Sequence, residues 1–97
     1  MIITIIEAQV PSNRWFDLEI AYKDKIKHNP PQLRETFLIQ DNKDRKVWRI
    51  ISIWHSMSEY EEAVKSMLED TCMQIFREVD VQPTRRIFDV PAHHIRV

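Results

Sequence analysis

The chain has 97 residues, the size of one domain, and a formal net charge of −1 with 30% charged residues. A charge this close to zero creates no field that attracts nucleic acid or an anionic membrane surface, so we expect neither partner. The one cysteine, Cys72, has no partner for an intrachain disulfide, which favours a cytoplasmic location. The apolar N-terminus is too short to span a membrane.

The chain contains no glycine. Phosphate-binding loops, the dinucleotide fingerprint and the nucleophile elbow all need glycine, because their backbone turns sharply or approaches a ligand closely. These motifs are therefore absent in standard form, and we expect no cofactor of the kinds they bind. Asn, Asp and Pro must form the turns instead.

Residues 2–10 are predicted to form a strand, because β-branched residues dominate and apolar side chains fall on both parities. Residues 13–28 then predict a helix that ends before Pro30. Its apolar positions recur at steps of three and four, and two further residues are expected to broaden the inward stripe. The recurring positions are Trp15, Leu18, Tyr22 and Ile26, and the two broadening residues are Phe16 and Ile20.

Residues 33–40 and 46–54 predict an antiparallel hairpin around the polar turn 41–44. Ser56 and Glu59 fit a capping box that starts a second helix. A break near residues 69–71 separates it from a shorter helix over 71–79, and residues 84–90 predict the last strand. The inward positions of these helices are Tyr60, Ala63, Val64, Met67 and Leu68, then Cys72, Ile75, Phe76 and Val79.

This order predicts one α+β domain over residues 1–97, a ferredoxin-like βαββαβ unit with a four-stranded antiparallel sheet and helices on one face. The other face would be bare and apolar in a monomer. Its simplest cover is the same face of a second copy, so we expect a homodimer through the open sheet face.

The stretch 47–60, VWRIISIWHSMSEY, resembles the antibiotic-biosynthesis-monooxygenase-like family, in which an apolar strand ends in Trp before a Ser-containing link and a helix. The resemblance implies a dimeric α/β barrel. Related barrels include cofactor-free monooxygenases, haem-degrading enzymes and stress-response proteins. Haem-degrading members use Asn, Trp and His where this chain has Glu7 or Gln9, Ala63 and Gln74, which argues against haem degradation.

The resemblance draws attention to His55 and Tyr60 as candidate catalytic residues. A histidine beside a cavity can act as a base near neutral pH, although a histidine in the link beside the Ser56 cap is the alternative. An apolar pocket for a small aromatic ligand is the second expectation, with ordinary core packing as its alternative. Its candidate residues are Trp15, Tyr22, Trp54, Met73 and Phe76.

Other polar residues have simpler interpretations. Adjacent His93 and His94 point apart on an extended chain, so we expect no metal site. Cys72 is expected to be a buried, unreactive thiol. Glu7 and Arg34 lie on strands that look buried, so they should pair with each other or with Arg49, or line a cavity. The arginines 77, 85 and 86 predict either a local basic patch or a charged, protected edge strand.

Three functions remain open. The first is a cofactor-independent monooxygenase acting on a small aromatic or quinol-type molecule. The second is a non-catalytic ligand-binding or stress-response dimer, and the third is a structural or regulatory subunit that uses the sheet face on another protein. The residues alone leave open whether the protein is an enzyme, because they show no convincing acid–base pair.

Overall fold

The computed structural model describes residues 1–65 and 70–96. The strands are β1 (Ile2–Gln9), β2 (Leu33–Gln40), β3 (Val47–Trp54) and β4 (Thr84–Asp89). The helices are α1 (Trp15–Lys25), α2 (Met57–Val64) and α3 (Thr71–Glu78), and the short 3-10 turns η1 (Ser12–Arg14) and η2 (Ile26–His28) flank α1. The βαββαβ order is confirmed, while the predictions for Met67, Leu68 and the break at Glu69 lie outside the described residues.

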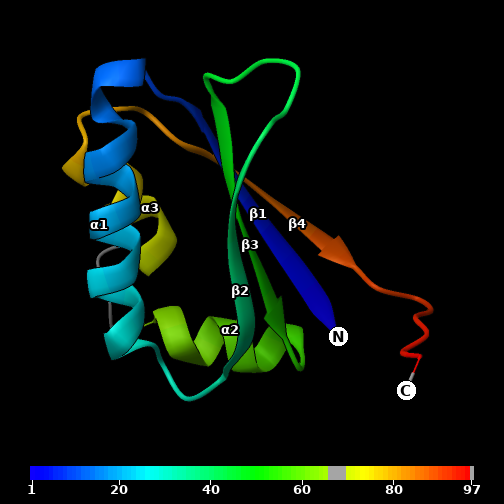
Figure 1. Cartoon of the computed structure of the whole chain (residues 1–97). Helices are drawn as coiled ribbons and strands as arrows, with labels where there is room; N and C mark the ends of the chain where they lie inside the picture. Colours follow the sequence, from blue (N-terminus) through cyan, green and yellow to red (C-terminus); the bar gives the residue numbers. More distant parts are fainter. Residues whose placement is uncertain (66–69, 97) are drawn as a thin grey trace.

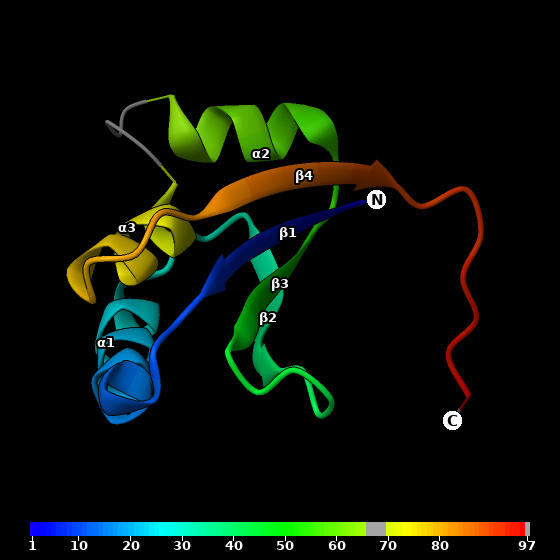
Figure 2. The same ribbon diagram turned by 90° about the horizontal axis from the view of Figure 1, so that it is seen from above.

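The sheet is antiparallel throughout, with the strand order β2-β3-β1-β4 of a ferredoxin-like unit. Figures 1 and 2 show the helices on one side of this sheet, with the C-terminal tail leading away from its far edge. Burial alternates along β1 and β3, because their even-numbered residues face the helices and their odd-numbered residues face away. The predicted fold class is therefore confirmed, and within a single chain no described helix covers the second face, although His93 and Ile95 of the C-terminal tail lie beside one end of it.

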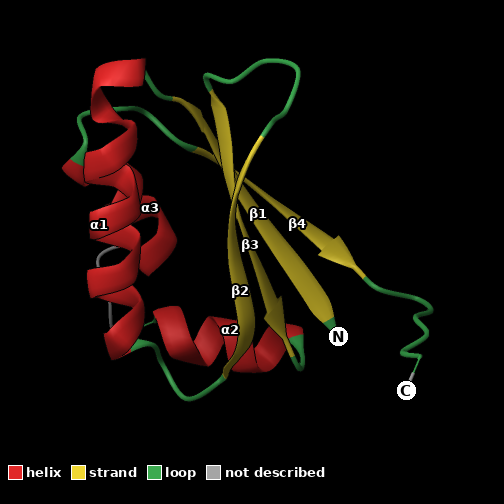
Figure 3. Cartoon of the chain, viewed as in Figure 1, coloured by secondary structure: helices red, strands yellow, loops and turns green. Residues whose placement is uncertain are grey.

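Two apolar clusters fill the space between helices and sheet. The larger one packs Leu18 of α1 and Phe76 of α3 against Ile6 and Ile50, which are all fully buried. The smaller one joins α2 to the ends of β1 and β3, where Figure 3 shows α2 crossing below the sheet. Its buried members are Ile2, Trp54, Tyr60 and Ala63.

The expectation that Phe16 and Ile20 broaden the inward stripe of α1 is wrong. They are 72% and 50% exposed, whereas Leu18 is fully buried. Each lies two residues from Leu18, which is roughly 200° around a helix, so they occupy the opposite face. The helix therefore contacts the core along a narrow stripe centred on Leu18.

Aspartate forms the turns that glycine would often form. Asp80 ends α3 with φ 61°, the one positive φ among the described residues. The amide of Asp80 donates to the Arg77 carbonyl and that of Val81 to the Phe76 carbonyl, which is a Schellman motif. The polar turn predicted at 41–44 is confirmed in the β2–β3 hairpin, where Asp41 accepts hydrogen bonds from the amides of residues 43 and 44 in an Asx-type turn.

The N-terminus of α2 is capped as predicted, since the Ser56 hydroxyl accepts from the Glu59 amide at 3.2 Å. Within residues 1–65 and 70–96, no helix is long and apolar enough to cross a membrane. The same part of the chain holds no group of three or more His, Cys, Asp or Glu placed to bind a metal ion.

Candidate functional site

A chain of polar side chains is buried where α2, α3 and the sheet meet. We call it the seam cluster, and its members are Trp54, Tyr60, Asp70, Cys72 and Arg85. Trp54 ends β3, Tyr60 lies in the first turns of α2, and Asp70 is the N-cap of α3. All except Arg85 of β4 are at most 4% exposed. Elements far apart in the sequence therefore supply one site.

Hydrogen bonds join four of these residues, all except Trp54, in series. Arg85 donates from Nη1 to the Tyr60 hydroxyl at 2.8 Å, and Tyr60 donates to Asp70 Oδ2 at 3.1 Å. The other carboxylate oxygen, Asp70 Oδ1, accepts the Cys72 amide at 2.8 Å. This satisfies the buried carboxylate, and the Arg85 guanidinium balances its charge across the phenol ring, 5.9 Å from the ring centroid.

The Tyr60 hydroxyl and the Cys72 thiol both have raised pKa values. Burial, and then the nearby Asp70 carboxylate, raises the pKa of Tyr60 to about 12. The same causes raise the pKa of the Cys72 thiol to about 12. Tyr60 is therefore a proton donor at neutral pH, and Cys72 is the unreactive buried thiol that the sequence predicts.

Further hydroxyls continue the polar chain into the sheet. The Ser52 hydroxyl lies 3.5 Å from Cys72 Sγ and donates to the Thr36 hydroxyl at 3.3 Å. The indole of Trp54 donates to the Thr4 hydroxyl at 3.0 Å. Thr4 and Ser52 are fully buried, and these bonds satisfy polar atoms that would otherwise be costly in the core.

A small cavity adjoins the cluster. Trp54, Asp70 and Cys72 line it, together with residues of η2, β2, α2 and the following loops, among them Ile26, Leu33 and Val64. Its volume is about 10 Å³, room for roughly one water molecule. An aromatic ring fits only if the lining side chains move apart.

The structure divides the residues predicted to form a ligand pocket. Trp54 belongs to the smaller apolar cluster and packs edge-on against Tyr60, with ring centroids 4.9 Å apart. Phe76 is fully buried in the larger cluster, and the half-buried residues Trp15, Tyr22 and Met73 pack against it. Among these five, Trp54 alone lines the small cavity, and the ligand-binding role of the set stays a prediction.

The two predicted catalytic residues lie in different surroundings. Tyr60 is buried in the seam cluster, whereas His55 is exposed in the link between Trp54 and Ser56. Sequence reasoning did not identify Asp70 and Arg85 as partners of Tyr60. The one signal in the sequence was an acidic residue directly before the predicted helix at 71, the position of an N-cap.

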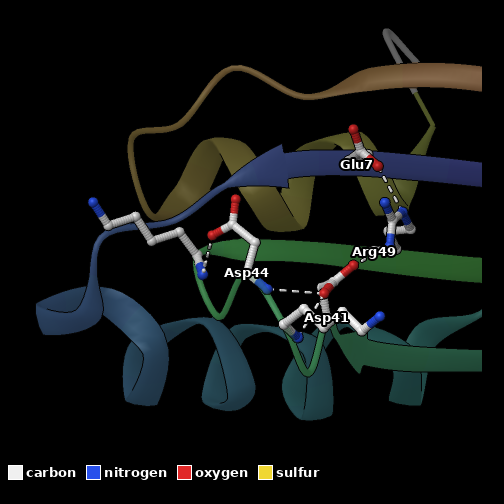
Figure 4. A network of polar contacts seen from close by, with 6 residues as sticks. Glu7, Asp41, Asp44 and Arg49 are labelled. Atoms are coloured by element: carbon white, nitrogen blue, oxygen red, sulfur yellow. Dashed lines mark hydrogen bonds and ion pairs between the residues drawn. The ribbon is translucent and has the colours of Figure 1, made fainter.

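The sheet face away from the helices, which we call the open face, carries a second polar network (Figure 4). Arg49 donates from Nε to Glu7 at 2.6 Å and lies 3.5 Å from Asp41, which anchors the hairpin turn. Backbone hydrogen bonds from residues 44 and 43, and then Arg49, lower the pKa of Asp41. The predicted pairing of Glu7 is therefore confirmed with Arg49 as the partner, rather than Arg34.

A hollow of about 190 Å³ lies beside this network on the open face, lined by Ile5, Glu7, Arg49, Thr84, Arg86 and Phe88. The predicted patch of arginines 77, 85 and 86 is wrong. Successive residues of β4 face opposite sides, so Arg85 joins the seam cluster and Arg86 the open face. Arg77 bonds Gln82 at the end of α3.

No protein-family model and no curated protein matches the chain. Solved structures match its fold. SnoaB, a cofactor-independent oxygenase from Streptomyces nogalater solved as a variant, is 8% identical with a TM-score of 0.72, over 95% of this chain and 94% of its own. An antibiotic biosynthesis monooxygenase is 12% identical with a TM-score of 0.69, over 95% and 100%.

A third similar structure is a variant of MhuD with two manganese protoporphyrin IX molecules per active site. It is 14% identical with a TM-score of 0.76, over 99% of this chain and 100% of its own. Identities this low show a shared fold and nothing of shared chemistry. The predicted likeness to antibiotic-biosynthesis-monooxygenase-like structures is thus confirmed for the fold.

Proposed function

We propose that the protein is an oxygenase that needs no bound cofactor and acts, as a homodimer, on a small electron-rich aromatic such as a hydroquinone. The observation that carries the proposal is the seam cluster, where a phenol is held between a carboxylate and a guanidinium beside the indole of Trp54. The fold likeness to a cofactor-independent oxygenase supports the same reaction class.

In this reaction the substrate itself reduces oxygen. One oxygen atom forms a C–O bond to the hydroquinone ring, the other leaves as water, and the ring becomes a hydroxyquinone. Atoms and electrons balance without an external reductant. Once the lining side chains move apart to admit the ring, Tyr60, which is protonated at neutral pH, supplies the proton for the departing oxygen, and Arg85 stabilises the phenolate of Tyr60 left behind. His55 is the base candidate beside Trp54, and its role stays a prediction.

Oxygen uptake with a panel of hydroquinones tests the proposal. A general acid contributes roughly 10²–10⁴-fold to a rate, so Tyr60→Phe should reduce uptake by at least about a hundredfold. His55→Gln tests the base role, and His28→Gln at the end of η2 is its matched control. No uptake by folded wild-type protein across the panel would exclude oxygenase activity on this substrate class.

Porphyrin chemistry is not part of the proposal. In haem-degrading members the first strand supplies Asn, but here Glu7 faces away from the helices and is paired with Arg49. Ala63, at the expected Trp position, is a buried small side chain on α2. These residues do not suit a porphyrin between helices and sheet.

A second function, a non-catalytic small-ligand-binding dimer, is favoured by the exposure of His55, which places the base candidate in solvent, away from the buried seam cluster. Native mass spectrometry of gently purified protein distinguishes the two functions. A retained aromatic ligand that is returned unchanged in the presence of oxygen indicates binding alone. A ligand that is converted to a quinone with uptake of oxygen indicates catalysis.

The homodimer is part of both functions. The open face exposes large apolar side chains, with Phe37 at 44%, Ile39 at 37% and Phe88 at 36%. A contiguous apolar face of this kind is typical of an interface between proteins. We expect the mass of a dimer at micromolar concentration, and a monomer under those conditions would exclude this arrangement.

A further inference from the structure

Cross-strand register arranges the open face as a grid of side chains, each row running from β2 through β3 and β1 to β4. The first row is Glu35, Ile53, Ile3 and Phe88. The middle row is Phe37, Ile51, Ile5 and Arg86, and the last row is Ile39, Arg49, Glu7 and Thr84. The grid is therefore mainly apolar, with charges at a few defined positions.

Some of those charged residues have an ion-pair partner within the same chain and others do not. Glu7 and Arg49 are paired within the chain at 2.6 Å. Glu35 and Arg86 make no ion pair among the described residues, and the guanidinium of Arg86 lies over the ring of Phe88, 5.0 Å from its centroid. Covering the face would bury both charges, which is costly unless the cover supplies partners.

A second copy can cover this grid about a two-fold axis in either of two directions. With the axis parallel to the strands, β2 lies over β4 of the second copy and β3 lies over its β1, while each row stays level with itself. With the axis perpendicular to the strands and over the middle row, each strand lies over its own equivalent. The first and last rows then exchange places.

The charges suit only the parallel axis. In that arrangement Glu7 lies over Arg49 of the second copy, and Arg49 over its Glu7. Glu35 lies over the first row of β4 in the second copy, one row away from its Arg86. One row is roughly 7 Å along a strand and packed sheets lie roughly 10 Å apart, and the long side chains of Glu and Arg can span that gap. The perpendicular axis instead sets Arg86 against Arg86 and buries Glu7 on the apolar Ile3.

We propose that two copies pair through the open face with the two-fold axis parallel to the strands. In this dimer Glu35 of each copy completes the hollow of the other by pairing with its Arg86. The inference rests on the homodimer of the proposed function and adds the register and the residues that set it. Electrostatic complementarity of this kind fixes register and suppresses wrong partners.

Charge reversal tests the pairing. Glu35→Arg, Arg86→Glu and the double variant with both changes are compared with wild type by sedimentation equilibrium at low salt, with circular dichroism to confirm folding. Each single change places like charges together twice per dimer and should raise the dimer Kd at least about tenfold. The double variant restores both pairs with reversed sign, so its Kd should return close to that of wild type.

The matched control is Glu62→Arg on the exposed side of α2, which should leave the Kd unchanged. The perpendicular arrangement predicts a different result. Arg86 already faces Arg86 of the second copy there, so Arg86→Glu exchanges one like-charge pair for another, and Glu35 faces Ile39, so neither single change should raise the dimer Kd about tenfold. A dimeric wild type whose single variants keep its Kd, or whose double variant is not rescued, therefore overturns the pairing and leaves the homodimer standing. A monomeric wild type overturns both the pairing and the homodimer.

Discussion

The raised pKa of Tyr60 predicts a specific loss of stability in alkali. An unfolded tyrosine releases its proton above pH ~10, whereas folded Tyr60 keeps its proton to about 12. Between these values the unfolded chain binds fewer protons, so the free energy of unfolding falls as pH rises. With pKa values of about 10 and 12, the loss at pH ~11 is ~1.4 kcal/mol.

The variant Tyr60→Phe cannot lose this proton, so it isolates the effect. Near pH 8 it should be less stable than wild type by roughly 1–3 kcal/mol, because Asp70 loses a donor and Arg85 an acceptor. Near pH 11 the difference should narrow by ~1.4 kcal/mol, since only unfolded wild type releases the phenol proton there. Urea unfolding at one fixed protein concentration measures both differences.

The control for this experiment is Val79→Ala, which removes buried apolar volume without changing a titrating group. Its difference from wild type should be the same at both pH values. A Tyr60→Phe difference that stays constant or widens on raising the pH would refute the reasoning, because the phenol would then titrate alike in the folded and unfolded chains.

Local geometry makes three further predictions. Native Cys72 should resist iodoacetamide near pH 8 and react only after unfolding, because it is 2% exposed and its pKa is raised to about 12. Rapid labelling of the folded protein would contradict this prediction. Ser56→Ala should lower the free energy of unfolding by ~1 kcal/mol, with Ser58→Ala as the control, since only the Ser56 hydroxyl accepts the Glu59 amide. Asp80→Gly should raise the free energy of unfolding by ~1 kcal/mol, because glycine tolerates φ 61° without strain. The variant loses the ion pair between Asp80 and Arg14, but Arg14 keeps its ion pair with Asp17. A lower Tm in thermal unfolding would show that the lost ion pair matters more than the relieved strain.

Periodicity predicted the fold because it reports what each element buries. Apolar residues on both parities of β1 and β3 indicated two covered faces, and the structure places helices against one of them. The same signal failed for Phe16 and Ile20, because an apolar residue at helical spacing does not state which face it serves. Their exposure on α1 could not be told from the sequence without the width of its contact with the core.

The seam cluster was harder to predict than the fold, since its contacts join residues distant in the chain. Tyr60 and Arg85 are 25 positions apart, and they meet only because the register of β4 turns Arg85 toward the helices and Arg86 away from them. The sequence shows two adjacent arginines and no indication of which faces inward. The same one-residue alternation decides that Glu7 faces away from the helices.

The pattern of charges on the open face also addresses how such a face avoids indiscriminate association. A wholly apolar sheet face would bind any other apolar surface, whereas buried charges penalise every partner that does not meet them. Within one chain Glu7 and Arg49 satisfy each other, but Glu35 and Arg86 lie on opposite edge strands and cannot meet. A second copy turned about an axis parallel to the strands brings these edges together. A copy displaced by one row moves Glu7 away from Arg49 of its partner, so the charges favour a single register while the isoleucines supply the driving force.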